Sequence, residues 1–351
     1  MKISVIITCY NLSRYIADTV RSVLEQEPGA YTPEIIVVDD ASTDGSGGII
    51  TGIPGCKLIR HERNRGVLHS MLDGIGAASG DVLCFLDGDD LWDPKKLKIV
   101  AAQFEGETDL VYLSHDYSYI GPRGESLGIR DRSQEGLRAA RDRFEADREM
   151  RNGILEYRGT VWLGSAHCLR RDAVDWNEFS AWVNQLPEPE MTYQDWPIAF
   201  WAASSKRGLL GYYPEKLMKY RIHSLNYSGD AGTRAKMLGN LRKGLNTVRA
   251  TADILNRRRP ELLNTRIEAK QLEYEYLSAL YEGRVCAALQ KFGRCAAKGY
   301  WTGAALRKEV MRTVGVGTLG AERFTRLAKW RGQHGIARQA GSKGFGSGAA
   351  Q

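Results

Sequence analysis

The sequence lacks any apolar run long enough to span a membrane, and its 351 residues contain no Cys-x-x-Cys pair. A spanning helix needs roughly 18 or more consecutive apolar residues, and closely spaced cysteine pairs are typical of zinc sites and disulfide frameworks. The six cysteines stand far apart, at Cys9, Cys56, Cys84, Cys168, Cys286 and Cys295. Scattered free thiols favour a reducing compartment, and the first residues, MKISVIITCYN, read as a strand and not as a secretory leader. We therefore expect a soluble, cytoplasmic protein.

Three ligand-binding motifs are also missing. No G-x-G-x-x-G follows the first predicted strand, which argues against a dinucleotide-binding domain. No D-x-[DN]-x-[DN]-G loop with a distal Glu is present, so a calcium-binding loop is not expected. A nucleotidyltransferase would need a basic, glycine-rich loop for a triphosphate after that strand, and the sequence there is Cys-Tyr-Asn-Leu-Ser.

Charge is present, but it is divided unevenly along the chain. The whole chain has 49 Lys and Arg against 42 Asp and Glu, a net charge of +7. Residues 231–351 hold 23 of the basic and 8 of the acidic side chains, a net charge of +15. Residues 1–230 therefore hold 26 basic and 34 acidic side chains, a net charge of −8. An acidic first part suits cation binding. A basic second part suits either contact with an anionic surface, such as lipid head groups, or an ordinary solvated set of helices, and no nucleic-acid partner is expected.

The first hundred residues alternate between strand and helix patterns. Apolar runs predict strands, and apolar spacing of three and four residues predicts helices; the strands are expected at 3–8, 35–38, 56–59 and 82–86, and the helices at 12–24, 68–78 and 95–104. Such alternation predicts an α/β fold with a mostly parallel central sheet flanked by helices. Ligands bind such sheets beyond the carboxyl ends of the strands.

The rest of the chain is less regular. The mixed-charge stretch 129–151 is either a solvated helix with internal ion pairs or an insertion that covers a substrate. Two further strands are expected near 161–169 and 211–220, and the chain is expected to be helical beyond residue 231. The predicted organisation is a domain at 1–230, a basic helical region at 231–335 and a disordered, Gly/Ser-rich tail at 336–351.

Acidic residues follow two of the predicted strands. Asp39 and Asp40 end the second strand, where they either cap the next helix or accept hydrogen bonds from a base N–H or ribose hydroxyls. Asp87, Asp89 and Asp90 follow the fourth strand within four residues. Three clustered carboxylates raise one another's pKa unless a cation compensates, and Mg²⁺ or Mn²⁺ is the natural occupant because hard cations prefer oxygen ligands.

Several segments together resemble family 2 glycosyltransferases, which are inverting, nucleotide-sugar-dependent enzymes of the GT-A (Rossmann-like) fold. They occur between Lys2 and Ser228 in the order and spacing of that family: TCYNLSRYIADTVRSVLEQ (8–26), IIVVDDASTDG (35–45), NRG (64–66), GDVLCFLDGDDLWDPKKL (80–97), GSAHCLRRD (164–172), TYQDW (192–196) and YRIHSLNYS (220–228). One departure is that Met71 and Leu72 stand where the family commonly has Arg and Asn, so that Arg63 or Arg65 would have to substitute.

The resemblance implies a role for each matching donor-site residue. Thr8 and Tyr10 would contact the nucleotide base, Tyr10 by stacking. Asp40 would pair with a uracil-type base, with Asp39 nearby. Asp87 and Asp89 match the D-x-D motif that meets ribose and the metal–diphosphate. Asp90 shares that cluster, and the sequence leaves open which of the three carboxylates binds the metal.

The resemblance also implies two residues from the later segments. Asp195 matches the catalytic base, although an Asp before Trp-Pro can simply cap a helix. His223 matches a further metal or diphosphate ligand, although a single His is often structural. His115 and His167 are expected to be structural, and Trp196 is the aromatic residue best placed to stack on a sugar.

The function that follows is transfer of a sugar from a nucleoside-diphosphate donor, with UDP-sugars favoured, to an acceptor hydroxyl with the help of Mn²⁺ or Mg²⁺. The expected acceptor is a bacterial surface glycan or its lipid-linked precursor, with peripheral contact to the inner face of an anionic membrane through the basic C-terminal region. The alternatives are a catalytically silent nucleotide-sugar or glycan-binding protein and a nucleotidyltransferase.

Overall fold

The structure is a computed structural model that describes residues 1–129, 135–157, 163–205, 207–223, 226, 233–301, 303–321 and 323. It divides into two compact units, of which the first comprises residues 1–223 and 246–267. The second contains the described residues of 224–245 and of 268 onward. The predicted boundary at residue 230 and the predicted tail at 336–351 lie outside the described residues.

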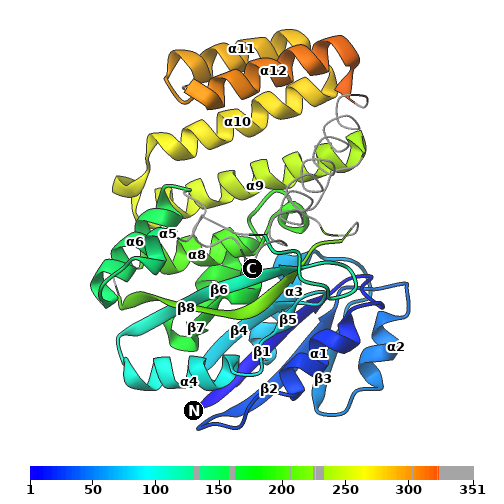
Figure 1. The fold of residues 1–351 in the computed structure, drawn as a ribbon, viewed down its shortest axis with the longest axis vertical. Helices are drawn as coiled ribbons and strands as arrows, with labels where there is room; N and C mark the ends of the chain where they lie inside the picture. The colour runs from blue at the N-terminus through cyan, green and yellow to red at the C-terminus, as the bar shows by residue number, and fades with distance from the viewer. Residues whose placement is uncertain are drawn as a thin grey trace, which may run out of the picture. The chain divides into compact units, whose positions relative to one another are not determined.

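An eight-stranded mixed sheet forms the centre of the first unit, in the order β3-β2-β1-β4-β7-β6-β8-β5 (Figure 1). The strands are β1 Lys2–Cys9, β2 Thr32–Asp39, β3 Cys56–Arg60, β4 Val82–Asp87, β5 Leu91–Trp92, β6 Leu110–Ile120, β7 Cys168–Arg170 and β8 Leu209–Arg221. Strands β1 to β4 pair in parallel, as β6 and β8 do, whereas β7 is antiparallel to both of its neighbours and β5 is antiparallel to β8. The predicted α/β fold with a largely parallel central sheet is confirmed.

Three strands differ from the sequence prediction, and the first of them, the two-residue β5, was not predicted. Strand β6 was not predicted, because the polar residues Ser114, His115 and Asp116 interrupt its apolar pattern, yet all three are buried. The strand expected at 161–169 is instead a 3-10 turn, Gly164–Ala166, followed by the short β7, and residues 158–162 lie outside the described chain.

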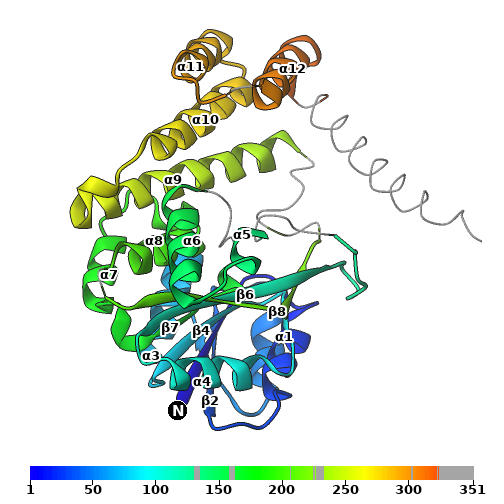
Figure 2. The same ribbon diagram turned by 60° about the vertical axis from the view of Figure 1, so that its left-hand side comes forward.

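Helices cover both faces of this sheet (Figures 1 and 2). The helices of the first unit are α1 Ile16–Leu24, α2 Ser46–Thr51, α3 Val67–Ala77, α4 Lys96–Gly106, α5 Glu135–Arg138, α6 Arg143–Leu155, α7 Trp176–Val183, α8 Asp195–Ser204 and the second half of α9 Arg234–Arg258. Ile3, Val5 and Ile7 of β1 share one core with α1, α2 and α4. Helix α3 lies on the opposite face, where Gly74 lets it approach Ile6 more closely than a side chain would allow.

The second unit is helical, as predicted for the residues beyond 231 that are described. It contains the first half of α9, most of α10 Thr265–Glu282, α11 Val285–Ala297 and α12 Gly303–Leu319. Its core joins α10, α11 and α12 through Tyr276, Leu280, Cys295 and Val316, together with Trp301. No helix in the described part of the chain combines the length and apolar character needed to cross a bilayer.

Candidate active site

The carboxyl ends of β1, β2 and β4 bring the acidic segments together. Strand register places Thr8 of β1 beside Asp87 of β4, and Cys9 of β1 beside Asp39 of β2. Thr8 Oγ1 lies 3.4 Å from Asp87 Oδ1. The convergence expected from the strand pattern is therefore present, at the end of the sheet where parallel folds bind their ligands.

Tyr10 sits on a loop that the segment after β2 holds in place. Asn11 has a positive φ of 55°, and its backbone N–H donates to Ser42 Oγ at 2.9 Å while its side-chain oxygen accepts from the N–H of Thr43 at 2.9 Å. Asp44 Oδ2 accepts from the N–H of Ser13 at 2.8 Å. These bonds fix the loop while Tyr10 stays 45% exposed, so its side chain is accessible for stacking.

Asp39 and Asp40 are both buried, but they have different partners. Asp40 accepts from the backbone N–H groups of Arg65 and Gly66, at 2.7 and 2.8 Å, and contacts His61 Nδ1 at 2.7 Å. Asp39 Oδ1 accepts from the N–H of Ser42 at 2.9 Å. Within the described chain Asp39 Oδ2 accepts no hydrogen bond, and Arg60 Nε lies 3.3 Å from it. Asp40 thus holds the loop before α3, whereas Asp39 Oδ2 is paired with Arg60 and accepts no hydrogen bond within the described chain.

The three carboxylates after β4 also differ from one another. Asp90 is completely buried, and its two oxygens accept from Ser165 Oγ at 2.7 Å and from the N–H of Arg221 at 2.9 Å. Asp87 and Asp89 are only partly covered. Asp87 Oδ1 accepts from Gln194 Nε2 at 2.9 Å. Asp90 therefore braces the turn from inside, while Asp87 and Asp89 keep solvent contact.

The pKa values of this cluster follow from its burial and mutual repulsion. Burial, with the charge of Asp89 added, raises the pKa of Asp87 to about 7. Burial and both neighbouring carboxylates raise the pKa of Asp90 well above its usual range. Carboxyl groups in this state fit a divalent cation, which would compensate their charge. Among the described residues, however, no three acidic, His or Cys side chains stand together as a ready-made ligand set.

His223 lies beside this cluster. Its Nε2 is 2.9 Å from Asp89 Oδ2, and its ring centroid lies 4.5 Å from that of Tyr15. Arg221 fixes the same segment, because its Nε donates to the carbonyl of Asp89 at 2.7 Å and its guanidinium lies over the Tyr15 ring at 4.9 Å. Sequence reasoning missed Arg221 and Tyr15.

Asp195 stands next to the residue that contacts Asp87. It is the first residue of α8, and the capping position before it is Gln194, which makes no side-chain capping bond. A methyl group at Gly164 would come within 2.6 Å of Asp195 Oδ1, so glycine is required for this approach. Asp195 therefore directly follows the residue whose side chain contacts Asp87, and Gln194 holds the capping position of α8.

A buried lysine under the cluster was not singled out from the sequence. Lys96 Nζ donates to the carbonyl of Ser165 at 2.7 Å and lies 3.8 Å from the centre of the Trp92 ring. Burial lowers its pKa to about 8. Ser165 in turn accepts from the N–H of Asp87 at 3.0 Å. The sequence Pro-Lys-Lys-Leu gives no sign that one of its two lysines is enclosed.

The remaining candidates have structural surroundings. His115 is buried with Nδ1 2.8 Å from the carbonyl of Asp116. His167 is buried 5.3 Å from the Tyr112 ring. Trp196 is 5% exposed and stacks on Tyr157 with ring centroids 4.5 Å apart, so it packs in the core.

The position that departs from the family pattern is also in the core. Met71 is completely buried. Arg65 pairs with Asp73, which also contacts His61 Nε2 at 2.9 Å. Arg65 is thus anchored in the loop before α3. Met71 itself has no polar group that could contact a nucleotide sugar.

Part of the chain is similar in sequence to known and uncharacterized glycosyltransferases. Residues 4–171 match the model of glycosyl transferase family 2. An uncharacterized glycosyltransferase of Nostoc sp. is 36% identical over 146 residues, which are 40% of this chain and 44% of that protein. A Bacillus subtilis protein named for teichuronic acid biosynthesis, TuaG, is 34% identical over 129 residues, 36% of this chain and 50% of that protein. The chain thus matches about half the length of these relatives.

A solved structure extends the likeness to most of the chain. A mannosyltransferase from Pyrobaculum calidifontis aligns with a TM-score of 0.51 and 15% identity, and covers 94% of this chain and 86% of that one. At this identity the likeness concerns the fold. The family model thus supports the resemblance to family 2 over residues 4–171, and the predicted α/β fold is shared with this solved structure.

Proposed function

The chain carries a glycosyltransferase family 2 domain over residues 4–171, and from that premise we propose that it transfers a sugar from a nucleoside-diphosphate donor to an acceptor hydroxyl, with inversion at the anomeric carbon. One observation supports the proposal: Gln194 Nε2 donates to Asp87 Oδ1 at the carboxyl end of the sheet, and Asp195 is the next residue in the chain. Donor-binding and proton-accepting groups thus share one site.

We place the nucleotide base between Tyr10 and Asp39. The exposed ring of Tyr10 offers a stacking surface, and Asp39 Oδ2 accepts no hydrogen bond within the described chain. A base with a ring N–H, such as uracil, would add a hydrogen bond to this oxygen, which otherwise pairs with Arg60, and a UDP-sugar is therefore the favoured donor. Asp40, which the resemblance suggested for this pairing, has both oxygens engaged by the loop before α3.

Mn²⁺ or Mg²⁺ fits the carboxylates next to the expected diphosphate. Asp87 and Asp89 would hold the ion, and His223 would orient Asp89 or join it, while Asp90 supports the turn from inside. A bound divalent cation stabilises the charge that develops on a departing phosphate oxygen. The mannosyltransferase of similar fold was solved in complex with GDP-Man and Mn²⁺.

Asp195 is proposed to take the proton from the acceptor hydroxyl as that oxygen attacks the anomeric carbon. A positioned general base contributes about 10²–10⁴-fold to a rate. Gly164 leaves the space in which the Asp195 carboxylate lies. The preceding residue, Gln194, donates from its side chain to Asp87. A single attack without a covalent intermediate inverts the anomeric configuration.

The acceptor is proposed to be a bacterial surface glycan or its lipid-linked precursor, since one relative is named for teichuronic acid biosynthesis. A cytoplasmic protein with peripheral contact to an anionic membrane through its basic C-terminal region suits a lipid-linked acceptor.

A donor screen tests this function. The full chain is incubated with UDP-, GDP- and TDP-sugars, with and without Mn²⁺, and release of the nucleoside diphosphate is measured. We expect cation-dependent release from a UDP-sugar, and loss of release in Asp195→Asn. Absence of release and of binding for every donor would contradict the proposal. Binding without release, with acceptors supplied, would favour the silent binding protein instead.

A further inference from the structure

Helices α11 and α12 of the second unit expose large apolar side chains. Val285 and Leu289 of α11 are 50% and 51% exposed, and Val310, Met311 and Val314 of α12 are 42%, 69% and 55% exposed. Eleven large hydrophobic residues are exposed in the described chain, so these two helices hold five of them. Clustered exposed apolar side chains on a soluble protein mark an interaction surface.

Basic side chains accompany these apolar residues on α12. Arg307 precedes Met311 and Val314 by four and seven residues, so all three share one helix stripe, and Lys308 is exposed beside them. The acidic residue of this helix, Glu309, is buried and pairs with Arg312 at 3.0 Å. The exposed positions therefore present apolar and positive groups. We call Val285, Leu289, Arg307, Lys308, Val310, Met311 and Val314 the α11–α12 face.

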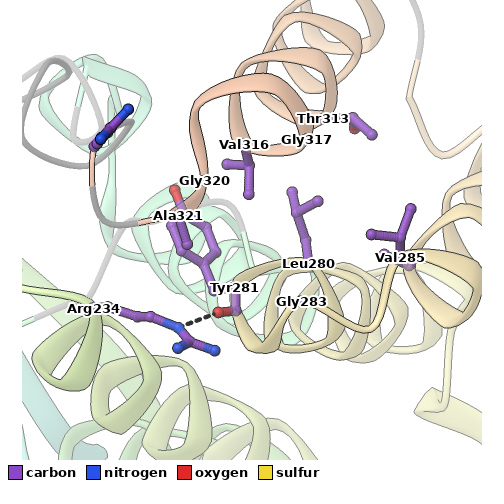
Figure 3. Close-up of a pocket in the computed structure, with 12 residues that line it drawn as sticks. Arg234, Leu280, Tyr281, Gly283, Val285, Thr313, Val316, Gly317, Gly320 and Ala321 are labelled. Carbon is purple, nitrogen blue, oxygen red and sulfur yellow. Dashed lines mark hydrogen bonds between the residues drawn. The ribbon is translucent and has the colours of Figure 1, made fainter.

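A cavity of about 600 Å³ lies at Val285, on the side of α12 that carries Thr313 and Val316 (Figure 3). Its walls include Val285 of the face and Leu280 and Val316 of the core, and its lining also contains Arg234 and Arg323. Arg234 Nε donates to the carbonyl of Tyr281 at 2.7 Å, which fixes this side chain at the cavity. The cavity thus combines apolar walls with two guanidinium groups, a combination that suits an anionic head group with an apolar body.

We propose that the α11–α12 face docks on a lipid bilayer that contains acidic phospholipids, with Met311 and Val314 in the interfacial layer and the cations at the head groups. An amphipathic helix with basic flanks binds such an interface through buried apolar area and electrostatic attraction. A second copy of the chain fits less well, because a symmetric contact would bring Arg307 and Lys308 toward their own counterparts. No helix in the described residues spans a membrane, so contact occurs at the surface.

This docking is independent of sugar transfer and is tested on the full chain by co-sedimentation with vesicles. Vesicles of phosphatidylcholine with phosphatidylglycerol are compared with vesicles of phosphatidylcholine alone. We expect binding to the first kind only. Each basic side chain near an anionic surface strengthens binding about fivefold, so Arg307→Glu with Lys308→Glu weakens it by roughly 25-fold or more. Met311→Asp with Val314→Asp weakens it by a factor of at least about ten.

Matched variants in the first unit serve as controls. Phe144→Asp changes an apolar side chain that is 61% exposed, and Arg21→Glu with Lys57→Glu reverses two exposed charges. Both are expected to bind like the wild type, and all variants should keep the thermal midpoint. Equal binding by the α11–α12 variants, or absence of binding to anionic vesicles, would overturn the proposal. A self-association that Met311→Asp with Val314→Asp abolishes would assign the face to a second copy and also overturn it.

Discussion

Glu34, near the amino end of β2, and Asp87, at the carboxyl end of β4, are partly covered carboxylates of the same sheet, yet their surroundings differ. Glu34 accepts from Ser4 Oγ at 2.5 Å and from the backbone and side chain of Ser79 at 2.8 and 2.7 Å, with Lys2 Nζ at 3.1 Å. Burial acts to raise its pKa, but these bonds outweigh burial and lower the pKa to about 2. Asp87, surrounded by neutral donors and Asp89, has a pKa of about 7.

These different surroundings indicate that Glu34 stabilises the fold, whereas Asp87 and Asp90 are suited to binding a ligand. Glu34 has its positive and hydrogen-bonding partners within the chain, so its charge contributes to stability. The charges of Asp87 and Asp90 are disfavoured by burial and by each other, so they oppose stability until a cation compensates. Functional sites commonly contain groups with pKa values displaced in this way.

The largest predicted effect concerns Asp195 at the carboxyl end. Asp195→Asn keeps the shape of the side chain but removes the proton acceptor, so we expect sugar transfer to fall by about 10²–10⁴-fold with donor affinity unchanged. Steady-state rates and equilibrium donor binding measure the two effects separately. Asp175→Asn is the matched control, because Asp175 caps α7 at an exposed site and Asn caps equally well. Equal rates for Asp195→Asn and the wild type would remove Asp195 from the mechanism.

The second prediction concerns the metal. Adding Mn²⁺ or Mg²⁺ to the wild type should raise its thermal midpoint, because the ion compensates the buried carboxylates and binds the folded state. Asp89→Asn removes one expected ligand and should abolish most of that rise. Asp93→Asn, which changes a nearby carboxylate outside the cluster, should respond like the wild type. If neither cation changes the thermal midpoint of the wild type, a metal site at Asp87 and Asp89 is contradicted.

The third prediction concerns the base-stacking surface. Tyr10→Ala should weaken nucleotide binding by about 1–3 kcal/mol, the usual contribution of base–aromatic stacking. Tyr10→Phe retains the ring and should bind like the wild type. Calorimetric titration with UDP distinguishes the variants. If the Ala and Phe variants bind equally well, the base does not stack on residue 10.

The smallest effect is expected for Glu34, near the amino end of β2. Its substitution should leave sugar transfer intact. Glu34→Gln should lower the free energy of unfolding by about 1–2 kcal/mol, after allowance for partial exposure. Because the folded pKa is below the unfolded value, the stabilisation is present above pH 4.5 and is lost as the pH falls toward 2. Wild-type stability should therefore fall over that window more steeply than that of the variant.

Denaturant unfolding at several pH values measures this difference. Glu62→Gln changes an exposed carboxylate and should follow the wild type at every pH. A Glu34→Gln variant with unchanged stability and an unchanged pH profile would show that the amino-end carboxylate is not a stabilising group, and the contrast between the two ends would disappear.

The sequence predicted the parts of the fold whose patterns are local. Strands β1, β2 and β4 are dominated by apolar residues, so their places in the sequence and the acids that end β2 and follow β4 could be read directly. Strand β6 could not, because the burial of His115 and Asp116 depends on tertiary partners: Asp116 pairs with Arg138 at 2.8 Å, twenty-two residues away.

The candidate site was predictable where residues sit at strand ends, and less so elsewhere. Ser165 and Gln194 reach the acid cluster from distant segments, and Lys96 is enclosed by Ser165 and Trp92; the motifs that contain these residues did not single out their side chains. The partners of Asp40 come from the loop at 61–66. The conformation of that loop cannot be predicted from the spacing of its residues, so the difference between Asp39 and Asp40 could not be predicted either. Long-range contacts therefore decide which acids are structural and which suit a ligand.

The most direct test of the account is the affinity of the full chain for UDP with and without Mn²⁺, measured by calorimetric titration for the wild type and for Asp89→Asn. We predict that Mn²⁺ strengthens UDP binding by the wild type and that Asp89→Asn loses this strengthening. UDP binding that is absent, or equally tight with and without Mn²⁺ in both proteins, would contradict the claim that the carboxyl-end acids hold a cation for a nucleoside diphosphate.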